Sequence, residues 1–159
     1  MLRKTAFAAL AAAALFTAVP AYAGPAETAY LQKLTNSWSG KGTLRGADTG
    51  TITCRVDLKA GSQNVKYQGR CTIPDMAGQA FNGSITYNDK AKRYESRTSS
   101  GVTAGVRRGD KLIFTTSSKS LAGSSFTTMT ISPSQFIIDF ALVDGKTGEK
   151  TTSRIVFSK

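Results

Sequence analysis

The stretch that decides the fold is residues 51–73, TITCRVDLKAGSQNVKYQGRCTI, which contains both cysteines of the chain. Within it, apolar and polar residues alternate over residues 52–58 and again over residues 65–73. This period of two is typical of a strand with one buried face. The stretch therefore predicts two neighbouring strands of a half-buried sheet.

One pairing of these two runs puts all the apolar residues on the same face. If Cys54 lies opposite Cys71 in an antiparallel hairpin, the turn falls at residues 61–64. The apolar partners then meet in pairs, Ile52 with Ile73, Val56 with Gly69 and Leu58 with Tyr67. A shift of one residue would move the apolar set of one strand to the polar face. The hydrophobic pattern and a Cys54–Cys71 disulfide therefore specify the same hairpin.

Residues 1–23 have the pattern of a secretory signal peptide. A basic start is followed by an apolar segment, residues 6–19, and by the small-x-small cleavage site Ala21-Tyr22-Ala23. The apolar segment is too short to span a membrane as a helix, and no second candidate follows it. We therefore expect cleavage after Ala23, export to the periplasm, where disulfides persist, and a single domain over residues 24–159.

The rest of the chain predicts an all-β fold. A helix is expected from Pro25 to Ser37, where apolar residues recur at intervals of three and four. The expected strands occupy residues 38–45, 52–59, 65–73, 81–87, 93–99, 102–106, 112–114, 121–131, 135–143 and 151–157. Successive short strands favour an antiparallel up-and-down barrel of about 8–10 strands with a short N-terminal helix. Closure is favoured because it removes exposed sheet edges.

The formal net charge of +11 favours anionic partners such as lipid head groups, glycans or acidic proteins. Export argues against nucleic acid as a partner. The basic residues are spread over alternate strand positions and are dense only at Arg107-Arg108 and over residues 90–93. Such a distribution is typical of a solvated outer face, and it also allows a dedicated anion site.

The chain contains no histidine, which excludes Ser-His-Asp and Cys-His catalysis and histidine-ligated zinc or haem. Pairing the two cysteines removes a thiol nucleophile as well. We therefore expect no enzymatic activity, no metal site and no cofactor. Among the carboxylates, Asp139 lies within the apolar run FIIDFAL, and it faces outward if Phe136, Ile138 and Phe140 face inward.

Aromatic residues on many strands provide the candidate binding site. They recur at alternate positions and are expected to project into one interior, either filling it or lining a ligand cavity. Periodicity does not separate these two alternatives. The candidate aromatic ligand-binding residues are Trp38, Tyr67, Phe81, Tyr87, Phe126 and Phe140.

Residues 36–44, NSWSGKGTL, resemble the opening strand of the calycins, the superfamily of lipocalins and fatty-acid-binding proteins. The spacing of Trp38, Gly40 and Gly42 is similar to that in nitrobindin-like barrels. The resemblance implies a barrel with an interior cavity, in which Trp38 closes one end. It also implies that an Arg or Lys of the last strand covers this ring, and Arg154 stands at that position. Nitrobindins hold haem through a histidine, so this ligand is not carried over.

These observations predict a periplasmic, non-enzymatic binding protein. Its calycin-like barrel would hold a small apolar or amphipathic ligand against the candidate aromatic residues and Arg154. The alternative is an envelope interaction or structural protein with a filled core, whose basic surface binds anionic lipid, glycan or acidic protein.

Overall fold

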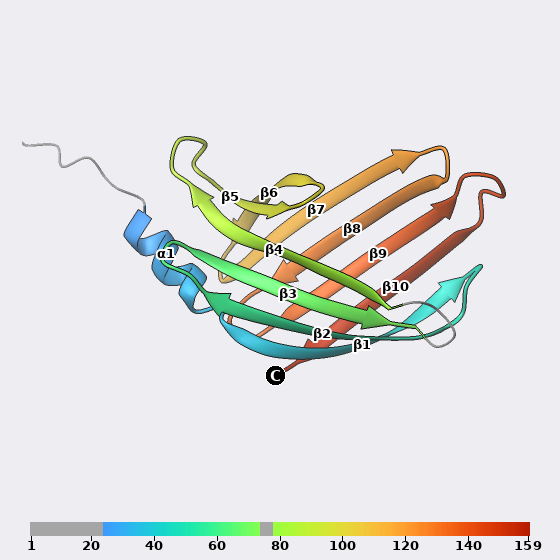
Figure 1. The fold of residues 1–159 in the computed structure, drawn as a ribbon, viewed down its shortest axis with the longest axis horizontal. Helices are drawn as coiled ribbons and strands as arrows, with labels where there is room; N and C mark the ends of the chain where they lie inside the picture. Colours follow the sequence, from blue (N-terminus) through green and yellow to red (C-terminus); the bar gives the residue numbers. More distant parts are fainter. Residues whose placement is uncertain (1–23, 74–77) are drawn as a thin grey trace, which may run out of the picture.

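The computed structural model describes residues 24–73 and 78–159, so the predicted signal peptide lies outside the described residues. Within the described residues, one helix precedes ten strands (Figure 1). They are α1 (Gly24–Gln32), β1 (Asn36–Gly46), β2 (Gly50–Ala60), β3 (Asn64–Thr72), β4 (Gln79–Asn88), β5 (Arg93–Thr98), β6 (Gly101–Arg108), β7 (Lys111–Ser120), β8 (Gly123–Ile131), β9 (Phe136–Asp144) and β10 (Lys150–Ser158). In these two ranges, no helix is both long and apolar enough to span a membrane.

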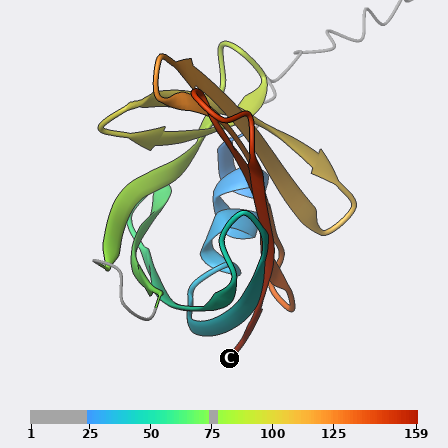
Figure 2. The same cartoon turned by 90° about the vertical axis from the view of Figure 1, so that its right-hand side faces the viewer.

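Each strand pairs antiparallel with the next one in sequence, and β10 pairs with β1 to close the barrel. The closing register places Gly40 opposite Phe157 and Lys41 opposite Val156. Figure 2 shows the ring of strands from one end, with α1 at the far end. The all-β, up-and-down barrel with a short N-terminal helix is thus confirmed, and closure leaves the sheet without an edge strand.

The β2–β3 hairpin has the register that residues 51–73 predict. Cys54 lies opposite Cys71, and a disulfide joins them. In the turn, the backbone N–H of Gly61 donates to the carbonyl oxygen of Asn64 at 2.8 Å. The other predicted pairs in the ladder, Val56 with Gly69 and Leu58 with Tyr67, are also opposite each other.

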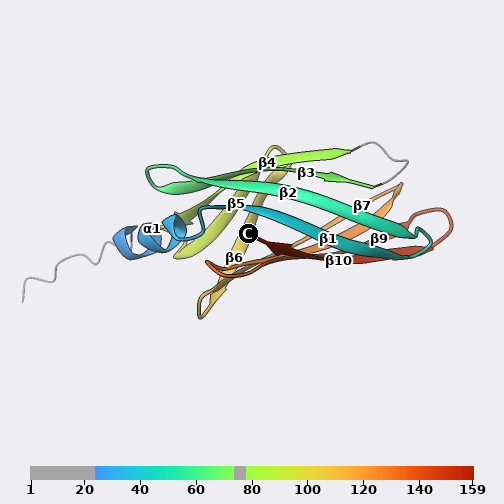
Figure 3. The ribbon, with the colours of Figure 1, turned by 90° about the horizontal axis from the view of Figure 1, so that it is seen from below.

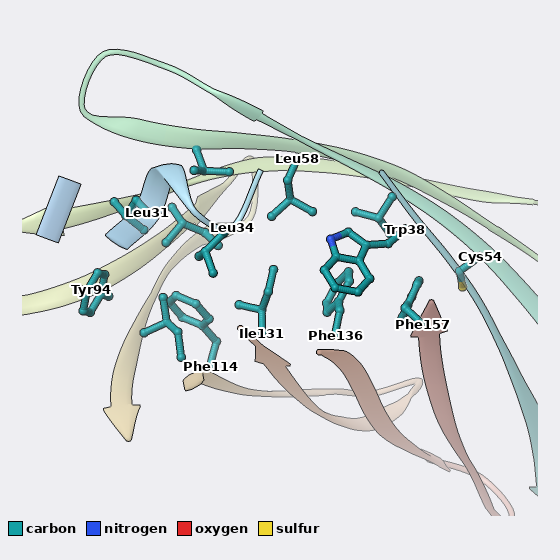
Figure 4. Packing of buried hydrophobic residues seen from close by; sticks show 14 of the residues in the cluster. Leu31, Leu34, Trp38, Cys54, Leu58, Tyr94, Phe114, Ile131, Phe136 and Phe157 are labelled. Carbon is teal, nitrogen blue, oxygen red and sulfur yellow. The ribbon is translucent and has the colours of Figure 1, made fainter. Parts of the chain in front are cut away.

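The core is concentrated at the end of the barrel where α1 packs. Leu31 and Leu34 are completely buried, and they extend from the α1 segment toward the strands (Figure 4). Trp38 lies beside Phe136, with the ring centroids 6.0 Å apart. The main buried residues that complete this cluster are Tyr30, Val56, Leu58, Val65, Ile85, Tyr94, Leu112, Phe114, Ile131, Ile155 and Phe157.

Gly40 allows the closure of this core. A Cβ atom at Gly40 would lie 2.6 Å from Cδ1 of Phe157, the residue opposite it in β10. The Phe157 ring therefore lies flat over the glycine and stacks on Phe136 with 4.3 Å between centroids. Glycine in this strand thus permits the close approach of a large neighbouring side chain.

Two elements differ most from the sequence prediction. The helix predicted over residues 25–37 ends at Gln32, because Asn36 and Ser37 already pair with β2 in the sheet. The strand predicted over residues 112–114 continues to Ser120, and its added residues are threonines, serines and one lysine. Strand pairing with β8 holds these polar residues in the sheet, although they lie outside the strands that the sequence predicts.

Candidate functional site

The inward face of β7–β10 changes from apolar to hydroxyl-bearing along the barrel. The inward residues that pair across these four strands form four levels, counted from the end of the barrel that α1 covers. The levels are Leu112, Ile131, Phe136 and Phe157; then Phe114, Met129, Ile138 and Ile155; then Thr116, Thr127, Phe140 and Ser153; then Ser118, Ser125, Leu142 and Thr151. We call the first two levels with α1 the plugged half, and the last two levels the open half.

Exposure increases in the same direction along β7–β9, whereas the inward residues of β10 are buried at all four levels. Each side chain of the first level is at most 6% exposed. In the open half, Phe140 is partly exposed, Thr116 is exposed and Leu142 is 46% exposed, although all three face inward. An open pocket of about 470 Å³ lies at this end and is lined by Ser118, Ser125, Leu142 and Thr151 together with turn residues. The barrel is therefore filled at one end and accessible at the other.

Ser153 has an unsatisfied hydroxyl group in the open half. The residue is only 7% exposed, and its Oγ has no hydrogen-bond partner among the described residues. The neighbouring inward hydroxyl is different, because Thr151 Oγ1 donates to Asp48 Oδ2 at 3.0 Å. A buried polar atom without a partner is costly, so Ser153 Oγ is a hydrogen-bonding group that the described residues leave unused.

Two of the predicted aromatic residues lie on the opposite wall of the barrel. Tyr67 Oη lies 2.9 Å from Ser96 Oγ, and burial raises the pKa of the tyrosine hydroxyl while this hydrogen bond lowers it less. The Tyr67 ring lies against Gly83, where a Cβ would be 2.5 Å from the tyrosine oxygen. Phe81 lies over Gly69 in the same way. Both rings therefore lie along the wall instead of across the interior.

Phe140 of the third level is a predicted residue in the open half. Trp38 and Tyr87 belong to the plugged half instead. Trp38 is 2% exposed, and Tyr87 makes an edge contact with Tyr94 at 5.1 Å between ring centroids. Of the predicted aromatic residues that face inward, Phe140 thus lies in the open half, and Trp38 and Tyr87 lie in the core. Tyr67 and Phe81 pack against the buried cluster on the opposite wall.

The predicted contact between Arg154 and Trp38 is wrong. Arg154 points outward, and its Nη1 forms an ion pair with Asp139 Oδ1 at 3.1 Å. The reason is the period of two in β10, since Ser153 and Ile155 on either side of Arg154 face inward. Lys159 covers the indole instead, with Nζ 5.5 Å from the ring centroid. The outward direction predicted for Asp139 is confirmed.

Phe126 does not face the interior either. It lies opposite Ala141, on the same face as the Arg154–Asp139 ion pair, and it is 49% exposed. Its neighbour Thr127 is the inward residue at this place, opposite Phe140. The sequence predicts the aromatic residue on the inward side, whereas β8 turns Ser125 and Thr127 inward and leaves Phe126 outward.

The sequence interpretation did not consider these inward hydroxyl residues. Thr127, Ser153 and Thr151 alternate with outward residues in the two segments TTMTI and TTSRI. The alternation was the available signal, but polar residues were assigned to the solvent side. Among residues 24–73 and 78–159, no group of three or more cysteine, histidine or carboxylate side chains is placed to hold a metal ion.

No protein-family model matches the sequence, and no curated protein matches it. Among solved structures, the chain is similar to Rv2717c from M. tuberculosis, with a TM-score of 0.56 and 12% identity over 84% of this chain and 96% of that chain. It also matches EF1p2_mFAP2b bound to DFHBI, with a TM-score of 0.45 and 17% identity over 84% and 98% of the two chains. The first likeness agrees with the fold described above, a small closed antiparallel barrel.

Proposed function

We propose that this protein is a periplasmic, non-enzymatic binding protein that holds a small amphipathic molecule in the open half of its barrel. The observation that carries the proposal is the change along the inward face of β7–β10, from packed apolar residues to accessible hydroxyl groups. A ligand would place its apolar part against Phe140 and Leu142 of the open half and would reach Met129 and Ile138 at the border of the plugged half. Its polar end would then lie near Ser153 and the outer hydroxyl level.

The size and polarity of the open end support a small ligand. Binding pockets for small molecules typically enclose about 300–1,000 Å³, and the pocket at the mouth has about 470 Å³. They combine apolar walls with a few polar groups that fix orientation. In this pocket Leu142 supplies an apolar wall, and Ser118, Ser125 and Thr151 supply polar groups. Phe140 and Ser153 lie one level deeper on the same inward face.

The remaining parts of the proposal rest on the sequence and the disulfide. The pattern of residues 1–23 supports export, and the Cys54–Cys71 disulfide suits an oxidising compartment. The lack of histidine and the pairing of both cysteines support a role without catalysis. The alternative of a wholly filled barrel requires a packed interior at both ends, and the partly exposed residues of the open half favour the binding role.

Two pairs of variants test the proposal, because each interior residue has an outward neighbour as its control. Phe140→Ala should weaken uptake of a fluorescent apolar probe about tenfold or more, since burial of a phenylalanine contributes roughly 1.5–3 kcal/mol. Phe126→Ala should leave uptake unchanged. Thr116→Phe should obstruct the interior and reduce uptake, whereas Thr115→Phe on the outer face should not.

Binding would be measured by fluorescence titration with 1-anilinonaphthalene-8-sulfonate and with a series of fatty acids. Native mass spectrometry of protein purified from its own envelope would detect a resident molecule. Protein that is consistently empty and takes up none of these probes would contradict the proposal. Equal losses in the interior and outward variants would contradict it as well.

A further inference from the structure

The outer face of β2–β5 carries an excess of positive charge. These four strands carry six basic residues and two carboxylates, and the register turns all eight outward. The basic residues are Arg55, Lys59, Lys66, Arg70, Arg93 and Arg97, and the acidic residues are Asp57 and Glu95. Figure 3 shows β2, β3 and β4 running side by side on this part of the barrel.

The Glu95 carboxylate already forms ion pairs and hydrogen bonds with nearby residues of β4 and β5. Its side chain is 3% exposed, and it accepts hydrogen bonds from Asn88, Arg93 and Arg97, the last at 2.7 Å. Desolvation raises the pKa of the Glu95 carboxyl, but the hydrogen bonds and the two arginines together hold the pKa below its ordinary value. Glu95 therefore stays ionised and neutralises only its own arginine neighbours.

The other four cations form two like-charged pairs across the β2–β3 ladder. Arg55 lies directly opposite Arg70, and Lys59 lies directly opposite Lys66. None of the four makes an ion pair with a carboxylate of the described ranges. Like charges at opposed positions of a sheet destabilise it. An anion placed over each pair would relieve this repulsion.

The spacing of the two pairs follows from strand geometry. Residues 55 and 59 lie on the same face of β2, four residues apart, which corresponds to about 13–14 Å. Two hollows overlie this face. One, of about 490 Å³, is lined by Arg55 and Arg70, and the other, of about 460 Å³, by Lys59, Lys66 and Arg97.

The two hollows share three polar residues between the cationic pairs, namely Asp57, Gln68 and Asn82. These three lie in one row across β2, β3 and β4. Ser37 Oγ donates to Asp57 Oδ1 at 2.6 Å, which leaves the second carboxylate oxygen as an acceptor. Amide and carboxylate groups between the cationic pairs can form hydrogen bonds with hydroxyl groups of a ligand. Asp57 would repel a continuous layer of negative charge.

We infer that the outer face of β2–β4 binds an extended anionic glycan. Acidic groups of the glycan, such as carboxylates or sulfates, lie over the Arg55–Arg70 and Lys59–Lys66 pairs. Sugar hydroxyl groups between them bond to Asp57, Gln68 and Asn82. The glycan must be long enough to place two anionic groups about 13–14 Å apart. This surface lies outside the barrel and is independent of ligand binding in the interior.

The test uses the full mature chain and heparin fragments of increasing length as the probe. Binding should strengthen sharply once a fragment is long enough to reach both cationic pairs. The double variant Lys59→Gln with Lys66→Gln should weaken binding of the longer fragments at least about fivefold, because two surface contacts are lost. The control, Lys119→Gln with Lys150→Gln, removes the same charge from outward positions on β7 and β10 and should change binding less than twofold.

Several outcomes would overturn the inference. Equal losses in the two double variants would mean that binding depends only on total charge. A disaccharide that binds as tightly as a hexasaccharide would contradict the spacing argument. Binding to vesicles that contain anionic lipid, without binding to any heparin fragment, would assign the face to a membrane surface instead. Circular dichroism spectra that match the parent protein would confirm that both double variants are folded.

Discussion

Phe136 and Phe140 lie four residues apart on the inward face of β9, yet their surroundings differ. Phe136 is 1% exposed and contacts the rings of Trp38 and Phe157. Phe140 is partly exposed and is flanked across the sheet by Thr127 and Ser153. The same residue type on the same face therefore fills a core at one end of the barrel and lines an accessible interior at the other.

The difference originates largely in α1. Leu31, together with Leu34 just beyond the helix, fills the plugged half, and Arg107 holds the helix in place. The Arg107 guanidinium lies 4.0 Å from the Tyr30 ring centroid and forms an ion pair with Glu27 at 3.2 Å. No described element covers the open half in the same way. The comparison teaches that a barrel of this size needs an added segment to fill it.

The largest expected effect is on stability in the plugged half. Phe136→Ala should lower the free energy of unfolding by about 3–5 kcal/mol, since it leaves a cavity in a packed core. The matched change Phe140→Ala should cost only about 1–2 kcal/mol, because that side chain is partly exposed. Urea denaturation of both variants measures the difference. Equal losses would show that the two halves are packed alike.

Removal of the disulfide should rank next. Replacing Cys54 and Cys71 with serine should lower the free energy of unfolding by roughly 3 kcal/mol, because the closed loop no longer restricts the unfolded chain. The sulfurs lie on the inward face beyond the aromatic core, so uptake of an apolar probe should also weaken. Unchanged uptake in the serine variant would place the ligand away from this hairpin.

The contacts of Arg107 with α1 should contribute less to the free energy of unfolding than the disulfide does. Arg107→Gln removes both the contact with Tyr30 and the ion pair with Glu27, and should cost about 1–2 kcal/mol. Amide hydrogen exchange should become faster in α1 and remain unchanged in β7–β10. Arg107→Lys should restore only part of the protection, since it lacks the planar group. Uniformly faster exchange over the barrel would contradict a local anchor.

The glycan-binding face predicts a small stability gain. Changing Lys59 and Lys66 to glutamine removes one like-charged pair and should raise the free energy of unfolding by roughly 0.2–1 kcal/mol at low salt. The gain should decrease as salt screens the charges. A loss of stability that does not depend on salt would show that these lysines support the fold.

The smallest effect concerns Asp144, in the turn at the open end. Backbone hydrogen bonds from Thr147 and Lys146 lower the pKa of its carboxyl below the usual 3.8. A lowered pKa stabilises the fold above the unfolded value, so this contribution is lost as pH falls below about 3.8 toward the folded pKa. Asp144→Asn should be nearly neutral at pH 7 and should reduce the acid loss. An unchanged acid transition would contradict this role.

Sequence periodicity did not determine the face of every strand. In β6, Val102, Ala104 and Val106 alternate like an inward set, but the register turns Gly105 inward and leaves Val102 and Val106 half exposed. The large ring of Phe114 from β7 occupies the space over Gly105. Phe126 faces outward for a similar reason. The pairing of β8 with its neighbouring strands, and not the residue type, determines which of its residues face inward.

The sequence by itself determined the β2–β3 hairpin, its disulfide and the all-β class. A period of two and two cysteines specify a pairing between segments close in the chain. Only the tertiary structure decided that one half is filled and the other accessible, and that Lys159, not Arg154, covers Trp38. These features depend on the contact of α1 with distant strands and on the β1–β10 register. The β1–β10 register pairs residues as far apart in the sequence as Ser39 and Ser158, and no local sequence pattern specifies such a pairing.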